Sequence, residues 1–174
     1  PPSPFYNPDN IKKTIILFLN LERVNSGKPA LVINRSINTA ARWHSDYMSE
    51  VQNLYHVANR KGMHDVNQRV ARYTERTGLC AEIIGFANSM NLREQLYTQK
   101  SDSEGTYLDF GDANIYWQNE TEIAMEFLNK TVNNKKDNSY KTYLENDIFN
   151  SIGGGITPGK FNSIDGWYGS FALV

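Results

Sequence analysis

Apolar residues recur every three or four positions in four segments of the chain, a spacing that gives a helix one apolar face. The clearest stripe covers 37–51, where apolar side chains and His44 fall at i, i+3, i+4, i+7, i+10, i+11 and i+14. The other three segments are 9–25, 65–76 and 121–132. This pattern predicts four helices, and Ser26 and Gly27 supply a stop for the first of them.

Three further segments are short apolar runs, which are typical of buried strands. They are LCAEIIGFA at 79–87, IFNSIGGGIT at 148–157 and GWYGSFALV at 166–174. The last two flank a turn through Pro158, Gly159 and Asp165, so they predict a C-terminal β-hairpin. Between 88 and 119 the chain is polar and irregular, and we expect a long excursion there with at most one short helix.

The order of these elements predicts an α+β fold. Helices come first and strands cluster late without a repeating βαβ rhythm, which favours an α-β-α sandwich around a central, mostly antiparallel sheet. A length of 174 residues suits one domain. The first residues, PPSPFYNP, are too rich in proline for a helix. We therefore expect an N-terminal tether at 1–8 and a single domain at 9–174.

Charge and cysteine usage exclude several classes of protein. The chain carries 18 basic and 19 acidic residues, a formal charge of −1, so it has no long-range attraction for nucleic acid or anionic membranes. It contains no apolar run long enough for a transmembrane segment. Its single cysteine, Cys80, excludes an internal disulfide framework and a CxxC metal site. Because Cys80 lies within an apolar run, we expect it to be a small buried residue.

Three kinds of charged or titratable residue carry the candidate chemistry. His44 lies in the middle of an apolar helix face, which favours a hydrogen-bonded core histidine over a metal ligand. Glu82 is a carboxylate inside an apolar run, so it must line a cleft or pair with a cation, and both readings stay open. Arg69, Arg72 and Arg76 recur along the third helix, where the pattern predicts a solvent-exposed face.

One motif suggests chemistry that its surroundings do not support. GGITPGK at 154–160 has the spacing of a phosphate-binding loop, but Phe161 follows where a serine or threonine is needed and no helix comes next. We interpret its glycines as sites of close packing in a strand. The chain also has no G-x-S-x-G motif, so a serine nucleophile is poorly supported.

Several segments, taken in order, resemble one known family. They are LFLNLERVNSGKPALVINRSINTAARWHSDYM, NLYHVANRKG, GLCAEIIGFAN and the strands that contain SIGGG and WYGSFALV. Over about 11–174 these segments resemble the CAP superfamily, the domain of cysteine-rich secretory proteins, antigen 5 and pathogenesis-related 1 proteins (the SCP-like domain), in its bacterial branch without disulfides. The composition, rich in Asn and Lys, suggests a spirochaetal outer-surface lipoprotein of this superfamily.

The resemblance also implies a cleft, although an incomplete one. In this family two histidines and two glutamates line a central cleft and bind a divalent metal such as zinc. His56 matches the first histidine and Glu82 the first glutamate, while Glu120 fits the second glutamate only with a shifted alignment. No histidine follows His64, so the second histidine has no counterpart. The resemblance therefore implies no tight metal cofactor, at most weak zinc binding, and a polar pair of His56 and Glu82.

The function implied is that of a secreted or surface-tethered binding module rather than an enzyme. The resemblance implies a lipid anchor upstream of Pro1, a place on the cell surface at the outer membrane, and a host protein, a sterol or a fatty acid as partner. The alternative is a divalent-metal-dependent hydrolase, which needs a further ligand from Glu120 or His64. We expect His64 itself to be an exposed or capping residue.

Overall fold

The computed structural model describes residues 5–75, 78–92, 97–103, 105–110, 115–136 and 138–174. Its helices are α1 (Pro8–Asn25), α2 (Arg35–Val51), α3 (Val66–Tyr73), α4 (Glu120–Lys130) and α5 (Ser139–Leu144). Its main sheet contains β1 (Val32–Ile33), β2 (Ala81–Asn88), β7 (Ser151–Phe161) and β8 (Ile164–Leu173). Two separate two-stranded ladders are β3 (Met90–Leu92) with β6 (Ile115–Trp117), and β4 (Tyr97–Asp102) with β5 (Gly105–Phe110).

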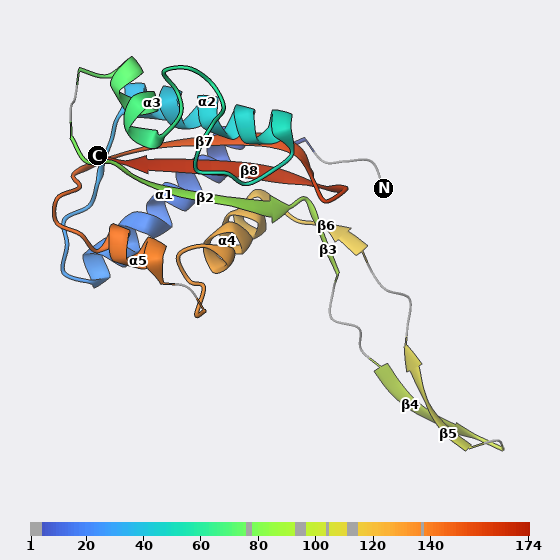
Figure 1. Cartoon of the computed structure of the whole chain (residues 1–174). Helices are drawn as coiled ribbons and strands as arrows, with labels where there is room; N and C mark the ends of the chain where they lie inside the picture. Colours follow the sequence, from blue (N-terminus) through green and yellow to red (C-terminus); the bar gives the residue numbers. More distant parts are fainter. Residues whose placement is uncertain (1–4, 76–77, 93–96, 104, 111–114, 137) are drawn as a thin grey trace.

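The main sheet has the strand order β1-β7-β8-β2 and is sandwiched between two helical layers. The strands β7, β8 and β2 are antiparallel, and only the short β1 runs parallel to its neighbour β7. Helices α2 and α3 cover one face of the sheet, and α1, α4 and α5 cover the other (Figure 1). The predicted α-β-α sandwich with a mostly antiparallel sheet is confirmed.

Side-chain caps explain where the longer helices begin. The N-cap residues of the four longer helices each accept a hydrogen bond from a backbone N–H of the first turn. These residues are Asn7, Asn34, Asp65 and Asn119. Asn119 and Glu122 form a full capping box. The predicted helix starts are therefore correct to within two residues.

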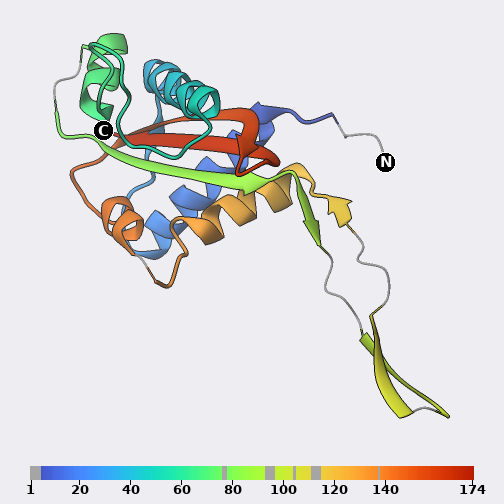
Figure 2. The same cartoon turned by 45° about the vertical axis from the view of Figure 1, so that its right-hand side comes forward.

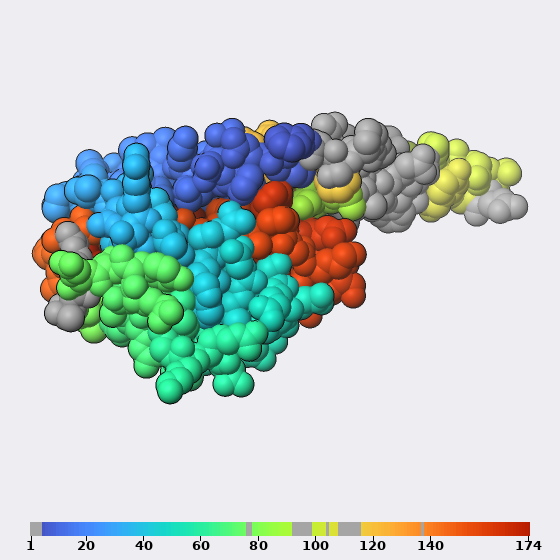
Figure 3. Space-filling model, turned by 90° about the horizontal axis from the view of Figure 1, so that it is seen from above, coloured from blue at the N-terminus to red at the C-terminus, as the bar shows by residue number. Residues whose placement is uncertain are grey.

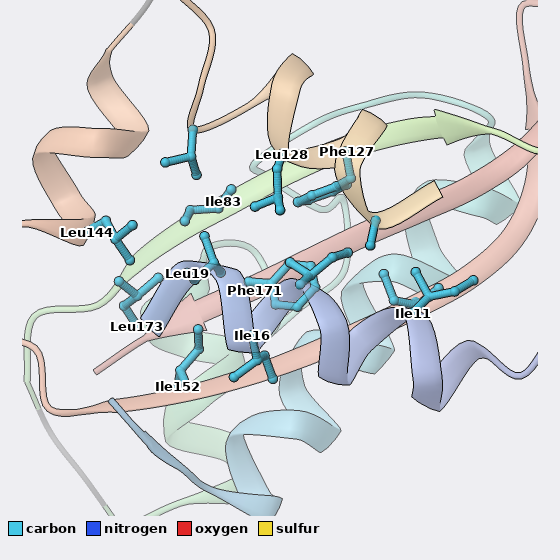
Figure 4. Close-up of a cluster of buried hydrophobic side chains, with 14 of the residues drawn as sticks. Ile11, Ile16, Leu19, Ile83, Phe127, Leu128, Leu144, Ile152, Phe171 and Leu173 are labelled. Carbon is cyan, nitrogen blue, oxygen red and sulfur yellow. The ribbon is translucent and has the colours of Figure 1, made fainter. Parts of the chain in front are cut away.

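The larger core lies between the sheet and the layer of α1, α4 and α5 (Figure 4). Phe127 of α4 and Phe171 of β8 meet there with ring centroids 5.3 Å apart. Two smaller clusters lie under α2 and α3, one around Ile37 and Val70 and one around Met48 and Phe86. Seen from above, α3 and the segment 52–65 lie beside α2 along one margin of the molecule (Figure 3).

Close packing between α2 and β7 explains the glycine-rich sequence of β7. A Cβ added to Gly153 would lie 2.3 Å from the backbone N of Asn38, and one added to Gly155 would lie 2.3 Å from the Cα of Arg42. The backbones therefore touch where a side chain would otherwise separate them. Residues 154–160 all lie within β7, so GGITPGK is part of a strand and not a phosphate-binding loop.

The region 88–119 differs from the expected irregular excursion with at most one short helix. Its described residues form strands β3 to β6 and contain no helix. The ladder of β4 and β5 stands away from the sandwich as a ribbon (Figures 1 and 2). The ribbon reverses near Gly105, whose φ of +137° strongly favours glycine. Aromatic and β-branched residues, as in GTYLDF and IYW, favour strands, and this preference outweighs the overall polarity of the segment.

Four smaller predictions also need correction. Cys80 precedes β2 and is partly exposed, whereas we expected it to be buried in a strand. The short helix α5 was not predicted, because its six residues are too few to show a helical stripe. The first hairpin strand begins at Ser151 rather than at 148, since Ile148 is 55% exposed and lies outside the sheet. The hairpin turns at Asn162 and Ser163, both with positive φ, so Pro158, Gly159 and Asp165 lie within the paired strands and not in the turn as predicted.

The expected tether at 1–8 is described only from residue 5 onward, and residues 1–4 lie outside the described residues. Tyr6 contacts the domain, because its hydroxyl donates to the carbonyl of Gln118 at 2.8 Å and its ring meets that of Trp167 at 5.5 Å. Among the helices of the described ranges, none is both long and apolar enough to cross a membrane.

Candidate functional site

Glu82 is the centre of the candidate site. Side chains alternate along β2, so Glu82 points toward the layer of α2 and α3 while Ile83 points into the larger core. Its carboxylate contacts side chains from α2, α3, β8 and the segment after α2, and the residue is only 5% exposed. A carboxylate can be held at such depth only if its oxygens find cations or hydrogen-bond donors.

Four side chains supply these contacts. One amino nitrogen of Arg69 donates to both oxygens of Glu82, at 2.9 Å to Oε1 and 2.8 Å to Oε2. His44 Nδ1 lies 2.7 Å from Oε1, and Ser170 Oγ donates to the same oxygen at 3.0 Å. His56 Nδ1 lies 3.3 Å from Oε2. We call these five residues the Glu82 cluster.

Arg69 also ties the cluster to the segment that follows α2. It donates to the backbone carbonyls of His56 at 3.1 Å, His64 at 3.0 Å and Met63 at 3.3 Å. The side chain is 1% exposed, so the prediction that it faces solvent is wrong. The prediction holds for Arg72, which is exposed, and Arg76 lies outside the described residues. Helix α3 is short and packs on both α2 and the segment before it, so its inward face is wider than its apolar stripe indicates.

The environment of Glu82 keeps its carboxylate ionised. Burial alone raises the pKa of Glu82, but the hydrogen bonds from His44 and His56 and the electrostatic interactions with His44 and Arg69 outweigh it. The pKa falls from 4.5 to about 2 as a result. The carboxylate therefore remains the negative centre of the cluster over the whole physiological pH range.

This pKa shift predicts how the stability depends on pH. Because the pKa of Glu82 is lower in the folded chain than in the unfolded chain, its contribution is complete above pH 4.5 and is lost as the pH falls toward about 2. As the pH falls through this window, we expect protonation of Glu82 to lower the free energy of unfolding by up to about 1.4 kcal/mol per pH unit, in addition to any other pH dependence. Urea denaturation of the wild type and of Glu82→Gln at a series of pH values measures the difference. Equal slopes for the two proteins in this acidic window would contradict it.

His56 connects the cluster to a cavity. Its side chain is 52% exposed, and its Nε2 lies 3.0 Å from the hydroxyl of Tyr140 on α5. His56 and Glu82 both line a cavity of about 500 Å³, which Cys80, Tyr140 and other residues complete. The structure thus brings together the two residues that resemble the family cleft. Burial is the main reason why the pKa of the Cys80 thiol is raised, so this thiol is a weak nucleophile at neutral pH.

His44 takes the role of a hydrogen-bonded core histidine, as the sequence predicted. It is fully buried in α2, and its Nδ1 contacts Glu82 as described above. Its Nε2 is buried and has no hydrogen-bond partner among the residues that the structure describes. Sequence reasoning missed Ser170 and Tyr140. Ser170 is a small polar residue within an apolar strand, and only the packing of β8 beside β2 brings it to Glu82.

Glu120 and His64 lie apart from the cluster. Glu120, in the first turn of α4, accepts a hydrogen bond from the backbone N–H of Asn7 at 2.7 Å. It lines a different cavity, together with Tyr6 and Trp117. His64 is exposed, and its Nδ1 lies 3.1 Å from the carbonyl oxygen of Ala58. The structure therefore brings neither residue to His56 and Glu82.

The donor set of the cluster does not fit the divalent metal that the resemblance to the CAP superfamily implies. Within the described ranges, no three His, Cys, Asp or Glu side chains are grouped so that they could hold a metal ion. Both oxygens of Glu82 face Arg69, whose guanidinium keeps its proton at any physiological pH. A metal would have to approach against this fixed positive charge. The guanidinium provides the positive charge in this cluster.

Comparisons with known proteins bear on the fold. No protein-family model and no curated protein sequence matches the chain. The structure of an outer surface protein from Borrelia burgdorferi is similar, with a TM-score of 0.59 and 14% sequence identity, covering 97% of this chain and 95% of that one. An extracellular protein from Bacillus anthracis that contains an SCP domain matches with a TM-score of 0.58 and 14% identity, covering 99% of this chain and 45% of that one. The chain therefore has a CAP/SCP-like fold.

Proposed function

We infer that the chain is a secreted or surface-tethered binding module of the CAP type rather than a metal-dependent hydrolase. The single observation that carries this inference is the pairing of Arg69 with both carboxylate oxygens of Glu82. A hydrolase of this kind would use the carboxylate as a metal ligand or as a general base. Here the oxygens already accept hydrogen bonds from inside the protein.

The protonation of the cluster further supports a structural role. A general base works best with a pKa near the working pH, whereas the pKa of Glu82 is about 2. His56 is the one member that reaches the surface, and it contacts Tyr140 as well as Glu82. The cluster therefore fixes the shape of the adjoining cavity, and that shaped surface is what the module would offer to a ligand.

Support for an extracellular location comes from the nature of the two similar structures. One is an outer surface protein and the other an extracellular protein. A formal charge of −1 gives the chain no general affinity for nucleic acid, which suits a surface domain that recognises a ligand by shape.

Calorimetric titration with zinc tests this function. At about pH 8, where histidine is neutral, we expect no saturable binding to the wild type, because Arg69 opposes the approach of a cation. The His56→Ala variant tests the cluster and His64→Ala serves as the matched control, since His64 is an exposed histidine outside it. Saturable zinc binding that His56→Ala abolishes and His64→Ala leaves intact would contradict the proposal and support a metal-dependent hydrolase instead.

A further inference from the structure

Strand β2 forms one edge of the main sheet, so one side of its backbone has no neighbouring strand among the residues that the structure describes. The pairing with β8 shows which groups face that side. The N–H of Ser89 donates to the carbonyl of Asp165 on the β8 side at 2.9 Å. Residues two apart share a direction in an antiparallel ladder, so the odd-numbered residues of β2 bond to β8. The even-numbered residues Glu82, Ile84 and Phe86 direct their N–H and C=O groups outward.

Contacts at the two ends of β2 agree with this assignment. The N–H of Cys80 points away from β8 and donates to Asn67 Oδ1 at 3.0 Å. The N–H of Asn88 likewise donates to Glu126 Oε1 at 3.3 Å. The ends of the edge are thus capped by side chains. The outward N–H and C=O groups of the three residues between them have no hydrogen bond to any residue that the structure describes.

Two cavities contact this edge, one on each side of Tyr140, whose hydroxyl lies 3.0 Å from His56 Nε2 on the opposite wall. The first, of about 500 Å³, contacts β2 at Ala81 and Glu82. The second, also of about 500 Å³, contacts β2 at Ile84, Gly85 and Phe86. Tyr140 lines both cavities. We call the pair of cavities the β2 groove.

The walls of the β2 groove come from both helical layers. One wall is the segment after α2, which contributes Leu54 to one cavity and Val57 to the other. The opposite wall is formed by the end of α4 at Thr131 and by α5 at Tyr143. Figure 1 shows β2 at the margin of the sheet with a helical layer on either side. The floor of the groove is therefore a backbone edge, and its walls carry mostly apolar side chains.

We propose that the β2 groove binds an extended peptide segment of a partner protein, which adds to the sheet beside β2. This inference rests on the proposed function and names its ligand class. The unpaired edge favours a peptide ligand, because the N–H and C=O groups of an extended backbone have the spacing needed to hydrogen-bond to β2. A sterol or fatty acid has no regular series of such groups. Apolar side chains at alternate positions of the peptide would enter the two cavities, and the peptide backbone between them would displace the Tyr140 hydroxyl from His56.

The test uses the full chain and a phage-displayed library of random dodecapeptides. We expect selected peptides to carry apolar residues at alternate positions. N-methylation of every second peptide residue should weaken binding about tenfold or more in one register and little in the other, because only one set of N–H groups faces β2. Equal effects of the two registers, or no enriched peptide at all, would overturn the proposal.

Two variants locate the bound peptide. Ile164 is 49% exposed and lines the groove, and Val32 is 68% exposed on β1 at the opposite edge of the sheet. Ile164→Asp should weaken binding about tenfold, since it places a charge beside an apolar pocket, while Val32→Asp should leave it unchanged. An equal response to both substitutions would place the peptide elsewhere and overturn the proposal.

Amide hydrogen exchange measured by NMR completes the test. In the chain alone, the N–H groups of Ile84 and Phe86 should exchange faster than those of Ile83 and Ala87, and bound peptide should slow them about tenfold or more. Protection that rises with protein concentration in the absence of peptide would mean that a second copy covers the edge, which overturns the proposal. Zinc titration is independent of these readouts, so failure of the peptide assignment and failure of the proposed function are distinguishable.

Discussion

Arg69→Met is expected to lower the free energy of unfolding by about 3–5 kcal/mol, because it leaves the carboxylate of Glu82 buried without the guanidinium that contacts both of its oxygens. Methionine retains most of the length of the arginine stem, so the loss of packing is small. The substitution also removes three hydrogen bonds to the carbonyls of the segment 56–64. Urea denaturation at neutral pH measures the change.

The matched control is Arg72→Met on the same helix. Arg72 is exposed, so its replacement should change the free energy of unfolding by less than about 0.5 kcal/mol. Combining Arg69→Met with Glu82→Gln should restore part of the loss, since the double variant buries no unpaired negative charge. A loss below about 1 kcal/mol for Arg69→Met would show that Glu82 does not depend on this arginine.

Gly155→Ala is expected to cost more than about 3 kcal/mol, at or beyond the upper end of ordinary overpacking. The new methyl group would lie 2.3 Å from the Cα of Arg42 and 2.4 Å from its backbone nitrogen. Both are backbone atoms of α2, so no side-chain rotation relieves the contact. The whole helix would have to move away from β7. Thermal unfolding followed by circular dichroism measures the effect.

Gly78→Ala is the control for this second substitution. A Cβ at Gly78 meets no atom within 4 Å, and its φ lies outside the left-handed region, so alanine fits without strain. We expect a neutral or slightly stabilising change, since alanine restricts the unfolded chain. If the two alanine variants unfolded at the same temperature, the close contact between α2 and β7 would be refuted.

The main elements of the sandwich could be predicted because their patterns are local. The stripe from Ile37 to Val51 specifies α2, and the apolar runs at 148–157 and 166–174 specify the hairpin of β7 and β8, although not the position of its turn. The ladders β3 with β6 and β4 with β5 could not be predicted in the same way. Their strands are short and polar, and their pairing joins residues such as Met90 and Trp117 that are far apart in the sequence.

The candidate site was only partly accessible from the sequence for a related reason. Glu82 is conspicuous, since a carboxylate within LCAEIIGFA requires a partner. The sequence left open whether that partner is a cleft or a cation, and the structure shows both, with Arg69 on one side and a cavity beside it. Arg69 could not be recognised, because one buried arginine among several on a short helix has no distinct pattern.

The pairing of Arg69 with Glu82 makes the central charge of this cleft part of the polypeptide itself. A cleft organised by an exchangeable ion depends on its surroundings, and it changes when that ion is scarce or withheld by a competing chelator. Here the positive charge is covalently attached to α3 and cannot be removed. A domain built in this way keeps the same cleft in an environment starved of metal as in one that is rich in it.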